Sequence, residues 1–415
     1  MKILAPLRLR EFRLLWTGMT VSLVGDGVTL VAIAWQVYEL SNTPTALGIT
    51  MMAMSIPQLI LLLFGGAISD RFDRRRVMLG ADLIRGVALA VMGLLSLGGI
   101  LEIWHMAVIA ACYGAGSAFF GPAFDAVVPE LVPTEWLPQA NPLDQFVRPT
   151  AARLLGPALG GWIIASVGVG WAFIVDAATF AVSVACLIRL GRIGRQPGQS
   201  ESAEGLTLWT EIREGLLFVR SRAWLWGTFL AATLTYLVFL GPSEVLLPYI
   251  VKNELEGGAG DLGMVLAAGG IGAVVAALIM AQRGLPARNM TFIYIAWSLA
   301  TLMVAGYGLA RAPWQAMLAC FAFNLCESAG LIVWITTKQL LVPPRLLGRV
   351  SSVDWFVSIG LVPVSYAVAG PIAEFAGARP TLIGAGILGA VITLVFLFLP
   401  GVRSAERAMP GETAS

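Results

Sequence analysis

The chain contains twelve long apolar stretches, six before a polar break and six after it. They cover residues 12–39, 45–69, 77–99, 105–131, 139–167 and 170–190, and then 223–251, 260–282, 289–310, 314–341, 347–376 and 380–400. A helix of roughly 20 apolar residues crosses the hydrocarbon core of a bilayer. Hydrophobic residues make up 58% of the chain and charged residues 13%, whereas soluble domains carry about 25% charged residues. The sequence therefore predicts an all-α integral membrane protein with twelve transmembrane helices.

The polar break divides the chain into two halves. We expect an N-terminal six-helix bundle over residues 1–190, a linker over 191–222, a C-terminal six-helix bundle over 223–402 and a tail over 403–415. The second half of the linker carries apolar residues at helical spacing, namely Leu206, Trp209, Ile212, Leu216 and Leu217. This spacing predicts a short amphipathic helix on the membrane surface, within a linker that otherwise acts as a tether.

The two halves also resemble each other in sequence. Leu131-Val132-Pro133 recurs as Leu341-Val342-Pro343, and Asp144 recurs as Asp354, at a constant offset of 210 residues. A half-chain repeat of six spans is typical of transporters that bind their substrate between two bundles near the membrane midplane. We therefore predict two pseudo-symmetric six-helix bundles.

Basic residues indicate how the spans are oriented. With both termini in the cytoplasm, 21 of the 27 Lys and Arg residues fall in inside segments and 3 in outside segments, while Arg85, Arg148 and Arg153 lie within spans. Lys and Arg accumulate in cytoplasmic loops. The sequence thus predicts a multi-pass protein of the inner (plasma) membrane, with an even number of spans and both termini in the cytoplasm.

The charged segment between the second and third spans carries the most specific motif. It reads Gly66-Ala67-Ile68-Ser69-Asp70-Arg71-Phe72-Asp73-Arg74-Arg75-Arg76. It resembles the loop motif of the major facilitator superfamily, in which glycine, three residues and Asp-Arg are followed by two residues and a basic run. This chain has Asp73 where the common pattern has a second glycine. The resemblance implies the major facilitator fold and a transport function.

The same resemblance implies that this loop is a gate, whose charges lock the two bundles together in the outward-facing state and separate when the inside opens. Asp70 ends the second span and is expected near the start of the eleventh, around Asp354. The alternative is that the arginines only anchor the topology. The residues assigned to the gate and its relay are Gly66, Asp70, Arg71, Arg74, Arg75, Arg76, Asp125, Glu130 and Asp354. The counterpart loop around Arg283 lacks the acid and the basic run, so the predicted gate is asymmetric.

A second motif lies in the fifth span, where Arg153 is followed by Gly156, Pro157, Gly160 and Gly161. The glycines let helices approach closely, and the proline frees a backbone carbonyl. The motif resembles one associated with major-facilitator antiporters, drug exporters in particular; the alternative is ordinary small-residue packing. Matching segments cover nearly the whole chain and resemble the branch that includes macrolide-efflux, multidrug-efflux and enterobactin-export proteins. They include Phe12 to Trp16, Gly25-Asp26 and Asp176 to Phe180.

Four ionisable residues are expected within the spans, three of them deep and Glu244 in the outer part of the seventh span, where such groups indicate function because their burial is costly. They are Asp26, Arg153, Glu244 and Glu327. Our hypothesis is that Asp26 binds a proton, with Arg153 as its partner, so that occupancy by a proton and by a cationic substrate alternates. The alternative is a permanent Asp26–Arg153 pair that only holds two spans together. Glu244 and Glu327 are candidates for binding a cationic substrate.

Other charged residues in the spans are interpreted as structural. Asp82, Arg85, Asp144 and Arg148 are expected nearer the inner surface, and Asp176 is expected near the outer end of the sixth span as a packing or capping group.

The remaining features narrow the function to transport. The chain has no nucleophile–base set, no metal-ligand cluster, no phosphate-binding loop and no basic aromatic groove, so we expect no enzyme activity, cofactor, metal or nucleic-acid partner. We predict a monomeric secondary exporter of hydrophobic or amphipathic small molecules, cations among them, such as drugs and antibiotics. It would work by alternating access as a proton antiporter. The alternatives are a dedicated exporter of an endogenous metabolite such as a siderophore, and a carrier of other solutes or lipids on the same fold.

Overall fold

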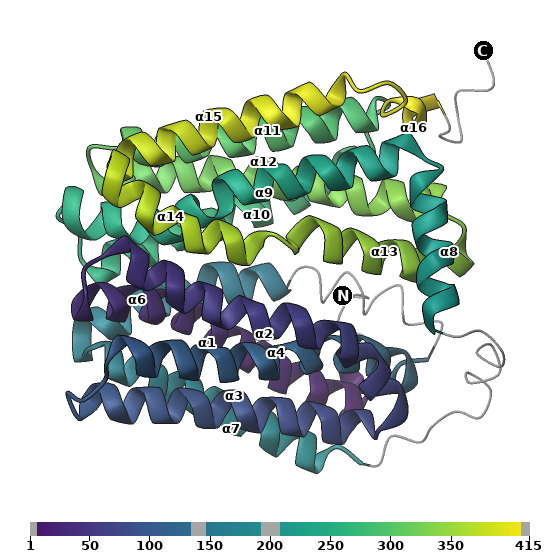
Figure 1. The fold of residues 1–415 in the computed structure, drawn as a ribbon. Coiled ribbons are helices and arrows are strands. Elements are labelled where there is room, and N and C mark those ends of the chain that lie inside the picture. Colours follow the sequence, from purple (N-terminus) through teal and green to yellow (C-terminus); the bar gives the residue numbers. More distant parts are fainter. Residues whose placement is uncertain (1–5, 134–146, 192–207, 408–415) are drawn as a thin grey trace. The chain divides into compact units, whose positions relative to one another are not determined.

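Helices form nearly all of the structure. A computed structural model describes residues 6–133, 147–191 and 208–407, while the side chains of 63–71 and of a few other helical residues lie outside that description. Within these ranges the chain contains no strand. The first half holds α1 (Arg10–Leu40), α2 (Pro44–Arg71), α3 (Arg74–Leu97), α4 (Ile103–Leu131), the π-helix η3 (Thr150–Leu155), α6 (Gly156–Val167) and α7 (Val169–Arg189) (Figure 1).

The second half continues the same pattern. It holds α8 (Leu208–Arg220), α9 (Ala223–Tyr249), the π-helix η5 (Ile250–Glu254), α10 (Ala259–Arg283), α11 (Asn289–Leu309), α12 (Pro313–Leu341), α13 (Pro344–Ile359), α14 (Val362–Ala376), α15 (Ala378–Leu397) and α16 (Ser404–Arg407). Among the described residues, twelve stretches are long and apolar enough to cross a membrane, with mean hydropathies from 1.2 to 2.4. The predicted all-α architecture with twelve spans is therefore confirmed.

The eleventh span differs from expectation because it consists of two helices, α13 and α14, rather than one. Pro363 has no N–H group to bond the carbonyl of Ile359, which weakens the helix at this point. The break also removes the usual N–H partner of the Val357 carbonyl. That carbonyl instead accepts a hydrogen bond of 2.9 Å from Thr233 Oγ1 on α9. The break is thus satisfied by a side chain inside the second half of the chain.

By packing, the chain divides into two units. One comprises residues 1–197 with 248–270, and the other comprises 198–247 with 271–415. Residues 248–270 follow the linker in sequence, but they pack with the first unit. In the first unit α3 packs against α4 and α7, and in the second unit α11 packs against the corresponding helices α12 and α15. The half-chain repeat of the sequence is therefore visible in the helix pairing.

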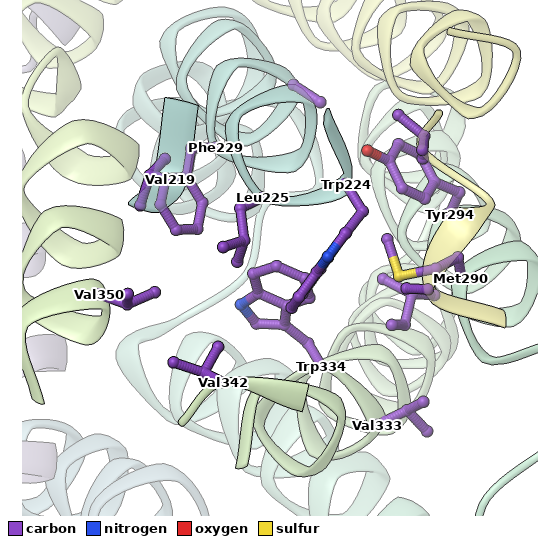
Figure 2. Packing of buried hydrophobic residues seen from close by; sticks show 14 of the residues in the cluster. Val219, Trp224, Leu225, Phe229, Met290, Tyr294, Val333, Trp334, Val342 and Val350 are labelled. Atoms are coloured by element: carbon purple, nitrogen blue, oxygen red, sulfur yellow. The ribbon is translucent and has the colours of Figure 1, made fainter. Parts of the chain in front are cut away.

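The second unit has a hydrophobic core centred on Trp334 of α12. Figure 2 shows this indole with Leu225 and Trp224 beside it, in a cluster that also includes Val219. The Trp224 and Trp334 rings meet edge to face with centroids 5.8 Å apart. Edge-to-face contact suits the charge distribution of aromatic rings. The apolar end of Trp334 thus fixes α12 within the core, while its polar end remains available for a hydrogen bond.

Candidate functional site

The Gly25-Asp26-Gly27 segment lies at the middle of α1 and contacts neighbours on different sides. A Cβ on Gly25 would lie 1.9 Å from Asp176 Oδ1 of α7. A Cβ on Gly27 would lie 2.4 Å from the Ala152 carbonyl and 2.8 Å from the Gly156 Cα. Side chains at either position would force these helices apart. The two glycines therefore allow α1 to pack closely on both sides of Asp26.

Asp26 itself lies among groups from α3 and α4. Its Oδ1 accepts a short hydrogen bond from the Tyr113 hydroxyl, and its Oδ2 lies 3.9 Å from Arg85 Nη1. The Asp26 side chain is 26% exposed, whereas that of Arg85 is 6% exposed. Asp26 is thus a partly accessible carboxylate with one phenol and one guanidinium beside it, an arrangement that suits a group that gains and loses a proton.

Arg85 is held mainly by a second carboxylate. Its Nη2 donates a short, charge-assisted hydrogen bond to Asp82 Oδ1. Asp82 is fully buried and also accepts a 2.6 Å hydrogen bond from Ser183 of α7. The guanidinium carbon lies 4.8 Å from the Phe120 ring centroid and 4.5 Å from that of Phe180, where cation–π attraction adds to the ion pair.

The sequence interpretation of Arg85 and Arg153 needs correction. Arg85 lies near the middle of the 24-residue helix α3 and reaches Asp26, so it lies deeper than we expected. It also occupies the place beside Asp26 that we had expected for Arg153. The useful signal was the spacing of Asp82 and Arg85, because residues three apart in an apolar helix lie on one face. Tyr113 gave no such signal.

Arg153 lies in η3, immediately before the span-five motif, and its side chain is exposed. Pro157 has no N–H group, so the Arg153 carbonyl loses its helical partner, which explains the local π-helix. A Cβ on Gly270 of α10 would lie 2.4 Å from this carbonyl. The motif thus brings a helix backbone directly against the freed carbonyl.

The glycines of the span-five motif contact two different helices. Built Cβ atoms on Gly156 and Gly160 would lie 2.5 Å and 2.9 Å from backbone atoms of α1, at Val24 and Val28 respectively. A Cβ on Gly161 would lie 2.7 Å from the Ala259 carbonyl of α10. Pro157 and these glycines are buried. The motif therefore positions the part of α1 that carries Asp26.

A third carboxyl lies behind Asp26. Asp176 of α7 is fully buried and accepts hydrogen bonds from Thr29 Oγ1 of α1 at 2.5 Å and from Thr179 Oγ1 at 2.8 Å. It is close enough to Asp26 and Tyr113 to interact with them electrostatically. The sequence placed Asp176 as a packing or capping group and did not indicate its contact with α1.

The charged residues of the loop motif have different hydrogen-bond and ion-pair partners. Asp73 caps α3 by accepting a 3.0 Å hydrogen bond from the Arg75 N–H. Arg74 pairs with Glu130 at the end of α4. Arg75 donates to the carbonyls of Leu187 and Ile188 at the end of α7, at 2.6 Å and 2.7 Å. The exposed side chain of Arg76 lies 3.8 Å from Asp73.

The other residues assigned to the gate are placed as follows. Asp125 lies 3.7 Å from Arg148. Asp354 accepts a short hydrogen bond from Lys338, a 3.0 Å bond from Trp334 Nε1 and a 3.0 Å bond from Ser358. Gly66 and the side chains of Asp70 and Arg71 lie outside the described part of the chain. The proposed proximity of Asp70 to Asp354 therefore stays a prediction.

The second unit contains a pocket with an aromatic wall and a carboxylate. Tyr236 and Phe239 of α9, Trp297 of α11, and Phe323 and Glu327 of α12 line it. The ring centroids of Tyr236 and Phe239, and of Phe239 and Phe323, are 5.8 Å apart. In the same unit, Glu244 accepts a short hydrogen bond from Tyr366 and does not line this pocket. No group of three or more potential metal ligands occurs among the described residues.

Twelve spans in two repeated sets of helices define a major facilitator transporter. The structure is similar to that of a bacterial homologue of the iron transporter ferroportin in an inward-facing state, with a TM-score of 0.69 and 14% sequence identity, covering 94% of this chain and 98% of that one. At this identity the similarity concerns the fold alone.

Sequence comparison places the chain more narrowly. The family model of the transmembrane secretion effectors, MFS_3, matches residues 1–411, and the chain belongs to this family. It is 28% identical to the multidrug efflux pump Tap of Mycolicibacterium fortuitum, over 97% of this chain and 98% of that protein. It is 23% identical to macrolide efflux protein A of Streptococcus pyogenes, over 95% and 97%. The resemblance to the drug-efflux branch predicted from the motifs is confirmed.

Proposed function

We propose that the protein exports amphipathic small molecules, cations among them, across the inner membrane in exchange for protons. It would be a monomer with both termini in the cytoplasm. The efflux functions named for its relatives support the direction and the class of substrate. The observation that carries the coupling mechanism is the environment of Asp26, a partly exposed carboxylate held by Tyr113 and facing the buried Arg85.

Asp26 can alternate between two charge states at modest cost. When it is ionised, the Tyr113 hydroxyl donates to it and Arg85 balances its charge. When it is protonated, Arg85 keeps its closer partner Asp82, so the guanidinium is not left uncompensated. Proton binding at Asp26 therefore leaves the Arg85–Asp82 pair intact, as a cycling site requires.

The pocket of the second unit has a volume of about 40 Å³, so it would hold only part of a drug-sized molecule, and its lining supports the substrate class. Its aromatic wall offers apolar and π surface, and Glu327 offers a negative charge. Flat amphipathic cations suit such a lining because they gain both hydrophobic contact and cation–π attraction. A site with few fixed polar groups also admits several substrates, as multidrug export requires.

The loop motif and its partners belong to the same proposal. The Arg74–Glu130 pair joins the start of α3 to the end of α4, so a displacement of the loop would be transmitted to α4. We assign Asp70 the central role in the gate, with Arg71 and the neighbouring arginines holding the loop at the inner surface.

The test is ethidium uptake into inverted membrane vesicles with an imposed pH gradient. Wild-type protein should accumulate ethidium when the vesicle interior is acidic. Asp26→Asn should abolish this accumulation but should still exchange ethidium across the membrane when no pH gradient is imposed. Glu11→Gln is the matched control, because Glu11 is an exposed acid in the first turn of the same helix. Undiminished proton-driven uptake by Asp26→Asn would contradict the coupling role.

A susceptibility panel separates broad export from the dedicated alternative. Overexpression should raise resistance to several unrelated amphipathic compounds, whereas deletion should lower it. A panel without any shift would instead favour a dedicated metabolite exporter.

A further inference from the structure

We propose that Asp176 is a second proton-binding carboxyl, coupled to Asp26, and that the protein exchanges two protons for each molecule exported. This inference rests on the proposed proton exchange and adds a residue and a stoichiometry to it. The site lies where α7 meets α1, inside the first unit.

The packing shows that the Asp176 carboxyl is built into the interface of α1. Its Oδ1 occupies the space that a side chain at position 25 would take, since a Cβ there would lie 1.9 Å away. Its Oδ2 accepts the hydrogen bond from Thr29, one turn further along α1. Asp176 is therefore fixed against the turn of α1 that carries Asp26.

The charges around Asp176 do not balance when every group is ionised. The titratable groups that interact with it are Asp26 on α1, Arg85 on α3 and Tyr113 on α4. Among the described residues Arg85 is the cation in this cluster, and its close partner is Asp82. The single positive charge of Arg85, already paired with Asp82, is then too little to compensate both Asp26 and Asp176. An unpaired buried carboxylate is costly, so at least one of these two carboxyls holds a proton until a bound cationic substrate supplies the missing positive charge.

The nearest partners of Asp176 are hydroxyl groups, not cations. Within the described part of the chain, its hydrogen bonds come from Thr29 and Thr179, and none of the ion pairs there includes it. A hydroxyl can donate to a carboxylate and can also accept from a carboxylic acid. The site can thus hold either form of Asp176 without moving a charged side chain.

Asp176 lies behind a more accessible carboxyl, and one N–H group of Arg85 has no partner among the described residues. Asp26 is partly exposed and Asp176 is buried behind it, with Tyr113 close to both. The Nε of Arg85 is buried and has no hydrogen-bond partner in the described structure. An Arg85 N–H without a partner is available to a carboxylate whose charge changes during the cycle.

The decisive experiment measures stoichiometry in proteoliposomes, with radiolabelled tetraphenylphosphonium as the probe and the membrane potential clamped at zero. The logarithm of the steady-state accumulation ratio is plotted against the imposed pH difference, and its slope is the number of protons exchanged per cation. We expect a slope of two for the wild type and of one for Asp176→Asn. Asp26→Asn should show no response to the pH gradient.

The outcomes separate the two proposals. A wild type that ignores the pH gradient overturns the proposed proton exchange. A wild type with a slope of one, or an Asp176→Asn variant that keeps the wild-type slope while Asp26→Asn loses its response, overturns only the role of Asp176.

Two further measurements keep the test valid if Asp176→Asn folds poorly. Thr29→Val should move the pH at half-maximal exchange, whereas Thr20→Val, the same substitution at an α1 hydroxyl that donates to the Trp16 carbonyl, should not. In the Asp26→Asn protein, infrared difference spectra should retain the carbonyl band of a protonated carboxylic acid that titrates with pH. The absence of both effects would show that Asp176 is only a packing group.

Discussion

The two glycines beside Asp26 show how much a single atom matters at this site. In a helix interior, glycine is less favourable than alanine by about 1 kcal/mol. Both glycines are nevertheless needed, because each faces the backbone or carboxyl of another helix within contact distance. The two glycines thus lower the helix propensity of α1 but allow other helices to pack closely around Asp26.

At the residue scale, we predict that Gly27→Ala destabilises the protein by about 1–3 kcal/mol, because its Cβ would overlap the Ala152 carbonyl. The matched control is Gly121→Ala in α4, whose Cβ would meet no atom within 4 Å. Thermal unfolding in detergent would measure both variants. Equal melting temperatures would show that the α1–η3 contact is looser than described.

The buried Arg85–Asp82 pair leads to a second residue-scale prediction. Arg85→Gln should cost about 3–5 kcal/mol, because it leaves Asp82 as an uncompensated buried charge. The double variant Arg85→Gln/Asp82→Asn removes both charges and should recover part of that loss. Melting temperatures of the single and double variants test this, and a double variant less stable than Arg85→Gln would refute it.

At the element scale, Arg75 couples the start of α3 to the end of α7. The last carbonyls of a helix lack partners within it, and Arg75 supplies donors to two of them. Arg75→Ala should therefore lower the stability by about 2 kcal/mol, since hydrogen bonds from charged groups are the stronger ones.

Arg76 provides the comparison for this prediction. Its side chain is 80% exposed and 3.8 Å from Asp73, so Arg76→Ala should change the stability by about 0.5 kcal/mol or less. Similar losses for the two variants, measured by thermal unfolding, would argue against the capping role of Arg75.

The helices themselves were largely predictable because lipid imposes a minimum apolar length on each span. The predicted first span, 12–39, corresponds to α1, Arg10–Leu40, and the predicted span 170–190 corresponds to α7, Val169–Arg189. The break between α13 and α14 was missed because apolar character continues through it. Pro363 was the local signal, since it removes one backbone donor at the break.

The contacts of the site were less predictable, because sequence spacing gives depth along a helix but not the direction in which a side chain faces a neighbour. Asp26 was identified from its depth in the first span. Its partner Arg85, however, was expected nearer the inner surface than the structure places it. Asp176 was interpreted as a packing or capping group near the outer end of its span. Its contact with Gly25 depends on two helices that are about 150 residues apart in sequence.

At the scale of the whole molecule, the repeat of the fold is not matched by a repeat of the charged loop. The counterpart loop follows Arg283 at the end of α10, where Gly284 adopts a left-handed φ of 69°. We predict that Asp70→Asn reduces drug export in vesicles by at least tenfold, whereas Arg283→Gln retains most of it. Equal effects of the two variants would contradict an asymmetric gate.

The division of the chain into packing units passes through the interior of α9 with η5 and through α10, because residues 248–270 pack with the first unit. Two of the boundaries between the units therefore fall within helical spans. Pro248 lies at one crossing and Gly269-Gly270 at the other, and proline and glycine are where helices bend most readily. Cleaving the chain at its linker would therefore divide the first packing unit, because residues 248–270 of that unit lie in the second half of the sequence.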